Sequence, residues 1–346
     1  MIKLYLADEF CHFEAGIQYN EHAFRRNIIL TLDQFASFRE QHRQYGLFTT
    51  AYRYDKPNIR EANMIGNLYI DFDVSDIQTD FEHVREDGLR TVAALKAIFG
   101  IEPDRMEFYF SGNKGIHLII PAEVLGVQPH PELHMIFKRI AEDMNKLTKH
   151  KTIDTRIYDK VRLFRIPNSI HPKTRLYKIS ITLDELKNLS LPELQRLARQ
   201  PRPVKKARRI YSTQANRIYQ DYVKEWEKEK KRMEARKKRA RSTTLDFMPP
   251  CIQHLLYEGV TEGKRNNSVA VLASYFLQRG VGEEEALERL LVWNDERCTP
   301  SLPEREIEKT VQSIYRMAYK YGCQKIQEVS ICSSSCKFYK DEDRRK

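Results

Sequence analysis

A basic stretch without glycine divides this chain into two parts with different folding patterns. Its residues 202–241 include 16 Lys or Arg and 5 Asp or Glu, whereas the rest of the 346-residue chain carries 43 residues of each sign. The formal net charge of +11 therefore falls in one segment, as expected for an arm that binds phosphates. The alternative is a solvated helix that only joins two domains. Strong helix propensity with a thin apolar stripe predicts a helical linker over 201–244, between domains 1–200 and 245–346.

Strand and helix patterns mix before this linker. The pattern predicts strands in 47–55, 67–74, 106–110, 116–120, 162–166 and 177–181, and helices in 81–100 and 131–147. The regular alternation of a doubly wound sheet is missing, so the expected fold class is α+β. After the linker the pattern is all-α, with helices expected in 266–280, 282–294 and 303–322.

Composition narrows the class of protein further. No apolar run approaches the roughly 20 residues of a membrane span, so no membrane partner is expected. The start, Met1-Ile2-Lys3-Leu4, lacks a signal-peptide layout, and the expected location is cytoplasmic. Five of the six cysteines lie after residue 250. In a reducing cytoplasm this clustering indicates metal binding rather than disulfides.

The expected strand 67–74 carries two carboxylates on one face. Asp71 and Asp73 are two residues apart, and side chains alternate along a strand. Neighbouring carboxylates repel each other unless a cation neutralises them. Mg²⁺ and Mn²⁺ prefer oxygen ligands, so the pair suits two-metal phosphoryl transfer. The alternative is a pair of solvent-facing residues on an edge strand.

A glycine-containing turn leads into another of the expected strands. Gly112 and Gly115 allow the backbone to approach a ligand closely. Ser111 and Lys114 supply a hydroxyl and a positive charge for phosphates. His117 follows at the start of the strand. The alternative is an ordinary hairpin turn with an exposed lysine.

The region around the next two short strands supplies a further carboxylate and several basic side chains. Asp154 is the third carboxylate, and Asp159 is an alternative close by. Arg162 and Arg165 share a short strand, and His171 follows after a proline turn. Arginine and histidine near a metal suit a triphosphate. The alternative is a basic loop without a ligand.

In this order and spacing, the three elements resemble the motifs of the archaeo-eukaryotic primase superfamily. That family carries D-x-D on a strand, then S-G-x-K/R-G-x-H, then an acidic residue followed by an R-x-P-x-S-x-H-like stretch. The matching residues are Asp71 and Asp73; Ser111, Gly112, Lys114, Gly115 and His117; and Asp154, Arg165, Pro167, Ser169 and His171. The resemblance spans about residues 45–180. This region is similar to the primase small subunit and, more narrowly, to single-chain primase-polymerases of mobile elements.

The resemblance implies a small-subunit-like catalytic domain around an RRM-like antiparallel sheet. It also implies that Asp71, Asp73 and Asp154 are catalytic and hold Mg²⁺ or Mn²⁺. The incoming NTP or dNTP would be bound by Ser111, Gly112, Lys114, Gly115 and His117, with Arg165 and His171 in support. The stretch Asp-x-x-Ile-Tyr favours Asp154 over Asp159 as the third carboxylate. The zinc-binding insertion of many members is not expected, because Cys11 is the only cysteine before residue 250.

The helical part after the linker carries a second resemblance. Its Pro-Pro-Cys-Ile opening and Tyr-Gly-Cys ending resemble the iron–sulfur domain of the primase large subunit. The resemblance implies a shared site of four thiols, Cys251, Cys323, Cys332 and Cys336. The last two are closer than in that family, so a 4Fe–4S cluster, a four-thiolate Zn²⁺ site and no metal all stay open. Arg265 and Asn266 begin a helix beside this site and are expected to contact template or the initiating triphosphate, the alternative being a plain helix start.

Together these patterns predict a nucleotidyltransferase that starts or extends strands on single-stranded DNA from NTP or dNTP. A replicative helicase is a candidate partner. Sequence-independent DNA binding is expected from a run of four basic residues in the linker, Arg236, Lys237, Lys238 and Arg239. Two alternatives are an end-joining repair polymerase and a non-catalytic replication initiator or nucleic-acid-binding module that retains the fold.

Overall fold

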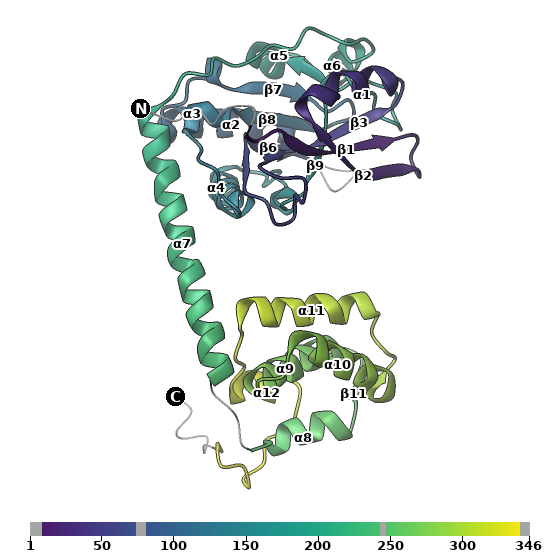
Figure 1. Cartoon of the computed structure of the whole chain (residues 1–346), viewed down its shortest axis with the longest axis vertical. Helices are drawn as coiled ribbons and strands as arrows, with labels where there is room; N and C mark the ends of the chain where they lie inside the picture. The colour runs from purple at the N-terminus through teal and green to yellow at the C-terminus, as the bar shows by residue number, and fades with distance from the viewer. Residues whose placement is uncertain (1–8, 74–80, 243–246, 340–346) are drawn as a thin grey trace. The chain divides into compact units, whose positions relative to one another are not determined.

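The computed structural model describes residues 9–73, 81–242 and 247–339. The chain divides into two compact units, Met1–Trp226 and Glu227–Lys346 (Figure 1). The first unit mixes strands and helices and the second is mainly helical, which confirms the expected α+β fold class and all-α C-terminal part. Among the described helices, none combines the length and the apolar character that a membrane crossing requires.

A four-stranded antiparallel sheet is the centre of the first unit. Its strands are ordered β10 (Ile179–Ile181), β7 (Glu107–Phe110), β8 (Ile116–Ile120) and β6 (Leu68–Phe72). One face is apolar and fully buried, and helix α2 (Phe81–Phe99) packs against β6 and β8. Helix α4 (Leu133–Leu147) lies beside α2. The opposite face of this sheet carries the polar side chains.

A second sheet holds most of the N-terminal residues. Its order is β5 (Met64–Gly66), β4 (Tyr52–Tyr54), β1 (His12–Gln18), β3 (Gly46–Thr50) and β9 (Leu163–Arg165), and β2 (Phe24–Thr31) also pairs with β1. Helix α1 (Phe35–Gln41) packs through Phe35 and Phe38 on an apolar cluster of this sheet. Through β9, the two sheets meet: the Phe164 ring stacks on Tyr69 at 4.5 Å.

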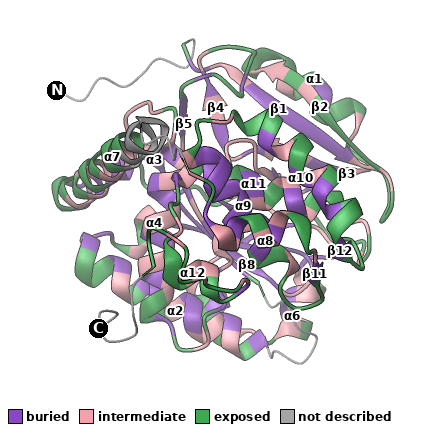
Figure 2. Cartoon of the chain, turned by 90° about the horizontal axis from the view of Figure 1, so that it is seen from below, coloured by how far each residue is buried: buried purple, intermediate pink, exposed green. Residues whose placement is uncertain are grey.

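Short helices and one long helix complete the first unit. The short ones are α3 (Ala122–Leu125), α5 (Leu183–Asn188) and α6 (Leu191–Leu197). Helix α7 (Thr213–Ser242) begins within this unit, where Ala215, Tyr219 and Trp226 are buried and recur at helical spacing. Most of its other described residues are exposed or half-buried (Figure 2). The expected linker 201–244 is therefore split, because residues up to Trp226 pack with the first unit.

The second unit surrounds one apolar core. It contains α8 (Pro250–Tyr257), α9 (Arg265–Gln278), α10 (Glu283–Arg297), α11 (Glu304–Met317) and α12 (Cys323–Gln327), with a two-stranded pairing of β11 (Val260–Thr261) and β12 (Cys298–Thr299). Helix α9 is buried along most of its length and packs on α8, α10 and α11. Cys298 belongs to this core.

Two sequence expectations about elements were wrong, and the sequence analysis named no strand where β1 and β2 lie. The strand expected over 47–55 is two strands, since pairing changes partner at Ala51. The helix expected to reach 322 ends at Met317, where buried Ala318 takes a left-handed conformation at φ +50° and the Tyr319 N–H donates to the Ile314 carbonyl.

Candidate active site

Strand register brings polar side chains of β6, β8 and β7 into one row. Asp71 pairs with His117, and His117 pairs with Tyr109 on its other side. Paired residues of antiparallel strands project from the same face, so these three side chains share the polar face of the four-stranded sheet. The distance between His117 Nε2 and Asp71 Oδ1 is 3.5 Å. Asp73 follows directly after the last residue of β6.

Backbone hydrogen bonds attach Asp154 to the end of β6. The Asp154 N–H donates to the Asp71 carbonyl at 2.9 Å, and the Asp73 N–H donates to the Thr152 carbonyl at 3.0 Å. The structure thus places Asp154 beside the other two carboxylates. Asp159 instead pairs with Arg162 at 3.0 Å. Of the two alternatives left by the sequence, Asp154 is the one joined to Asp71.

A buried carboxylate that the sequence analysis missed holds this segment in place. Asp87 lies on α2 with no exposed surface, and its carboxylate accepts hydrogen bonds from the Lys149, His150 and Thr152 amides and from the Thr152 hydroxyl. The sequence could have indicated this role, because Asp87 lies on the otherwise apolar face of an amphipathic helix, where charged residues are rare unless paired.

The pKa values of Asp71 and Asp154 are shifted in opposite directions. Burial, together with the charges of Asp73 and Asp154 and against the effect of Lys178, raises the pKa of Asp71 to about 7. For Asp154, burial raises the pKa, but hydrogen bonds from Arg156 outweigh it and lower the pKa. A divalent cation would relieve the repulsion at Asp71, and carboxylate oxygens are the donors that Mg²⁺ and Mn²⁺ prefer. The donor set therefore fits such a metal. The described residues nevertheless contain no group of three His, Cys, Asp or Glu side chains already closed around a metal position.

The glycine turn is held closely against the end of β6. Gly115 has no room to spare, because a Cβ there would lie 3.1 Å from the Phe72 carbonyl oxygen and 3.7 Å from Asp73 Oδ1. Gly112 has φ +86°, and its Cβ would lie 2.9 Å from the Tyr177 carbonyl oxygen. The Ser111 hydroxyl accepts a hydrogen bond from the Gly115 N–H at 3.0 Å. The left-handed conformation therefore requires glycine at position 112, and a side chain at position 115 would be tightly packed against β6.

Three side chains from later in the chain fix the carbonyl groups of this turn. Arg165 Nη2 donates to the Ser111 carbonyl at 2.6 Å, the Thr174 hydroxyl to Gly112 at 2.6 Å, and Gln195 Nε2 to Asn113 at 3.2 Å. The carbonyls are thereby occupied by protein donors. Lys114 is half-buried within the turn. Thr174 and Gln195 were not found from the sequence, because their role depends on contacts 62 and 82 residues away.

The basic residues around the turn differ in charge state. Burial lowers the pKa of His117 well below its usual value, and nearby Lys178 and Arg165 lower it further, so His117 is neutral. Burial also lowers the pKa of His171 to about 4, and its Nδ1 accepts from the Lys173 N–H at 3.2 Å. Arg165, with its pKa lowered by burial to about 10, remains a cation at neutral pH.

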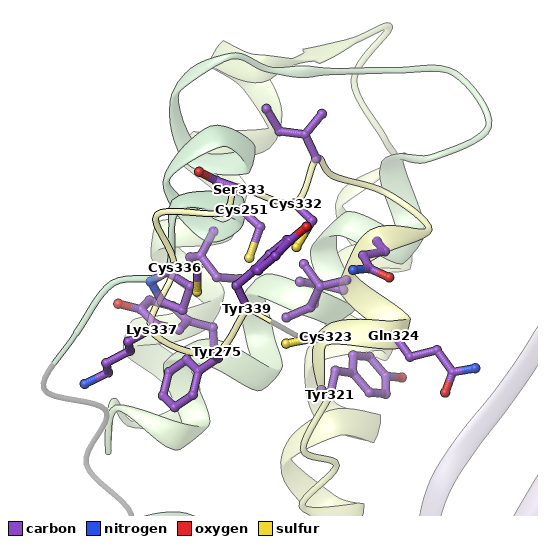
Figure 3. Close-up of a pocket in the computed structure, with 18 of the residues that line it drawn as sticks. Cys251, Tyr275, Tyr321, Cys323, Gln324, Cys332, Ser333, Cys336, Lys337 and Tyr339 are labelled. Atoms are coloured by element: carbon purple, nitrogen blue, oxygen red, sulfur yellow. The ribbon is translucent and has the colours of Figure 1, made fainter. Parts of the chain in front are cut away.

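Four cysteines of the helical unit line one pocket. Cys251, Cys323, Cys332 and Cys336 all border a cavity of about 970 Å³ (Figure 3). Burial raises the pKa of the Cys251 thiol, and Cys336 and Cys323 raise it further. The shared four-thiol site stays a prediction, and four thiols suit a cluster or Zn²⁺ chemically. Within the part of the chain that the structure describes, however, no three of them form a closed metal-binding group.

Of the residues expected to contact nucleic acid, the structure describes the side chain of Arg265 but not those of the basic run 236–239. Arg265 is largely buried: its guanidinium donates to the Pro300 carbonyl and lies 3.4 Å from Glu262. These contacts of Arg265 stabilise its own domain. The side chains of Arg236, Lys237, Lys238 and Arg239 lie outside the described part of the chain, although their backbone belongs to α7.

Comparison with known proteins identifies part of the helical unit. Residues 254–320 match the family described as Primase C terminal 1 (PriCT-1). Part of the second unit is therefore similar to this family. This agrees with the primase-type resemblance found in the sequence, although the matched segment covers α9, α10 and α11 and leaves out the four pocket cysteines.

Two solved structures are similar to the chain at low identity. One is the polymerase domain of Ligase D from Mycobacterium tuberculosis in complex with DNA, with 15% identity, a TM-score of 0.38, and coverage of 56% of this chain and 83% of that one. The other is the AEP domain of the cyanophage S-2L primase-polymerase (PrimPol), with 14% identity, a TM-score of 0.32, and coverage of 51% and 85%. No curated protein matches the chain.

Proposed function

We propose that the chain is a primase-polymerase that transfers nucleotides from NTP or dNTP to a 3′-hydroxyl on a single-stranded DNA template. The observation that carries this proposal is the meeting of Asp71, Asp73 and Asp154 beside the glycine turn 111–115. Three carboxylates gathered next to a turn with a lysine suit a metal-bound triphosphate. The match of the helical unit to a primase C-terminal family supports the same assignment.

The metal would be held by the three carboxylates. When bound, Mg²⁺ or Mn²⁺ would activate the 3′-hydroxyl and neutralise charge on the pyrophosphate leaving group. The protein's own groups would orient the triphosphate. Neutral His117 can donate one hydrogen bond to a phosphate oxygen, and its Nδ1 has no hydrogen-bond partner among the described residues. Lys114 and Arg165 would supply fixed positive charge.

The helical unit is proposed to serve strand initiation. Its pocket thiols would hold a 4Fe–4S cluster or Zn²⁺, and α7 would bind the DNA backbone through its basic residues. A replicative helicase is a proposed partner. Anaerobic metal analysis and visible absorbance of the whole protein would test the cluster. Loss of bound metal in Cys336→Ser, with metal retained in Cys11→Ser, is expected, whereas equal metal content in both variants would contradict it.

The test of the main proposal is nucleotide incorporation on single-stranded DNA with Mg²⁺ or Mn²⁺, with and without a primer. We expect incorporation in both cases, with NTP and dNTP compared separately. Incorporation only on primed or broken ends would favour the end-joining polymerase. DNA binding without any incorporation would favour the non-catalytic module.

A further inference from the structure

A second cavity lies on the polar face of the four-stranded sheet, beyond the row of Asp71 and His117. It has a volume of about 230 Å³ and is bordered by β6, β7, β8, β9 and the extended segment 204–209. Glu107 and Tyr109 belong to its wall, and the three carboxylates and Lys114 do not. Pockets for whole small-molecule ligands usually exceed about 300 Å³, so the cavity suits an ion smaller than a nucleotide.

Two basic side chains, buried Lys178 and half-buried Arg165, line this cavity. Burial and then the charge of Arg165 lower the pKa of Lys178 to about 7, so Lys178 is only partly charged at neutral pH, whereas Arg165 is a cation. Lys178 is 1% exposed, its Nζ donates to the Arg165 carbonyl at 2.8 Å, and it lies 5.1 Å from the Tyr109 ring centre. Arg165 uses Nη2 for the Ser111 carbonyl, but its buried Nε and Nη1 have no hydrogen-bond partner among the described residues. Leaving buried charged donors unpaired is costly, so a ligand that accepts from them is expected.

The rest of the lining adds positive charge. Lys206 and Arg209, both exposed, stand at the mouth. The carboxylate among the described lining residues, Glu107, is already engaged: it accepts from the Tyr109 hydroxyl at 2.7 Å and from the Ala207 N–H at 3.4 Å. Arg209 pairs with Glu123 at 2.6 Å and Lys178 is only partly charged, so the positive charge of the lining comes mainly from Arg165 and Lys206. The carboxylate of Glu107 already has donors, and the lining therefore favours an anion.

We propose that this cavity binds a pyrophosphate-type anion. Arg165 contacts the glycine turn and the cavity at once, which connects the proposed triphosphate position to this second site. The inference rests on the proposed function for its two sources of such an anion. One source is the pyrophosphate that nucleotidyl transfer releases, and the other is the 5′-triphosphate of the nucleotide that begins a new strand.

The direct test is titration of inorganic pyrophosphate into the full-length protein without nucleic acid, nucleotide or divalent metal, followed by calorimetry. Lys178→Met keeps the length and removes the amine that would donate to the anion, and it should weaken pyrophosphate binding roughly tenfold or more. Arg209→Gln, at the mouth, should weaken it in the same direction. Because Lys178 is buried, thermal unfolding of each variant must show a folded protein, and Arg209→Gln keeps the test valid if Lys178→Met does not fold.

The chain offers a matched control next to Arg209. Arg208 pairs with Asp104 at 3.1 Å just as Arg209 pairs with Glu123 at 2.6 Å, but Arg208 does not line the cavity. Arg208→Gln should therefore leave pyrophosphate binding unchanged. Equal binding by the wild type and Arg209→Gln would overturn the proposal. So would loss of binding in Lys114→Met together with full binding in Lys178→Met, because the anion would then sit at the glycine turn.

Enzyme assays separate the two sources. If the released product is the ligand, Arg209→Gln should raise the inhibition constant of pyrophosphate in primer extension. If the 5′-triphosphate is the ligand, Arg209→Gln should remove a preference for a 5′-triphosphate dinucleotide over a 5′-hydroxyl one. If pyrophosphate binding depends on Arg209 but the protein incorporates no nucleotides, the proposed function is refuted and the anion site stands. If the protein incorporates nucleotides but Lys178→Met and Arg209→Gln bind pyrophosphate as the wild type does, the anion site is refuted and the proposed function stands.

Discussion

The two faces of the four-stranded sheet are built from the same strands and have opposite characters. One face presents side chains that are at most 5% exposed and entirely apolar: Leu68, Ile70, Phe72, Phe108, Phe110, Ile116, Leu118 and Ile120. The other presents Asp71, His117, Tyr109 and Glu107 in neighbouring rows. Alternation along each strand assigns one residue to packing and the next to the candidate site.

Along each strand, residues that stabilise the fold alternate with residues that form the candidate site. The apolar face is closed by α2, and its side chains gain free energy from burial. The polar face holds a carboxylate whose pKa burial raises to about 7, which is a cost to the folded protein. Variants on the two faces should therefore change different measurements.

The largest effect is expected from the polar face. Asp71→Ala with Asp73→Ala should lower nucleotide incorporation at least about 1,000-fold, because the proposed metal loses two ligands. Single-stranded DNA binding should stay within about twofold, since the substitutions remove no positive charge. Incorporation assays and a binding titration of the same variant check this. Retained synthesis would refute the assignment of these carboxylates.

The apolar face should give the converse result. Leu118→Ala removes a side chain that is 1% exposed and should lower the free energy of unfolding by about 2–5 kcal/mol. Denaturant unfolding measures this loss. At a temperature where the variant is folded, its incorporation rate per folded molecule should stay within a few-fold of wild type. A large loss of rate in the fully folded variant would show that the two faces are not separable.

Local patterns explain how much of this arrangement the sequence predicts. The shared face of Asp71 and Asp73 follows from alternation, and the hairpin containing the glycine turn is contiguous in the chain. The expected sheet is antiparallel, as observed. The contributions of Lys178, Thr174 and Gln195 could not be predicted, because each depends on pairing between segments distant in sequence. Asp87 stands out on the buried face of its helix, but its partners could not be predicted for the same reason. The irregular strand β1, with a shift of register between Ala15 and Ile17, also hid its alternation.

A smaller effect should distinguish the faces by pH. The pKa of Asp71 is raised in the folded state to about 7, from about 4 when unfolded, so the folded protein binds more protons and loses stability as pH rises between these values. Asp71→Asn cannot ionise, so it should be more stable than wild type at pH 8 and little different at pH 4. The gain is at most about 4 kcal/mol, and smaller because 19% of the Asp71 side chain is exposed.

Metal should reduce this difference. Mg²⁺ or Mn²⁺ would stabilise wild type by binding the folded carboxylates, so the gap to Asp71→Asn should narrow as metal is added at pH 8. Thermal unfolding with and without metal measures it. If Asp71→Asn is less stable than wild type at pH 8 without metal, carboxylate repulsion is not a feature of this face.

The smallest effect concerns a carboxylate behind the sheet, and its sign is opposite. Burial raises the pKa of Asp87, but hydrogen bonds from His150, Thr152 and Lys149 outweigh it, so the folded pKa is lowered. A lowered pKa contributes stability that is present above the unfolded value of about 4 and is lost as pH falls through the folded value. Asp87→Asn should therefore destabilise the protein by about 2 kcal/mol at pH 7, because an amide accepts fewer of these bonds. Asp71→Asn should stabilise under the same metal-free conditions. The free energy of unfolding of both variants at pH 7 tests this. If Asp71→Asn and Asp87→Asn change it in the same direction, the hydrogen-bond donors around Asp87 do not explain the difference between the two carboxylates.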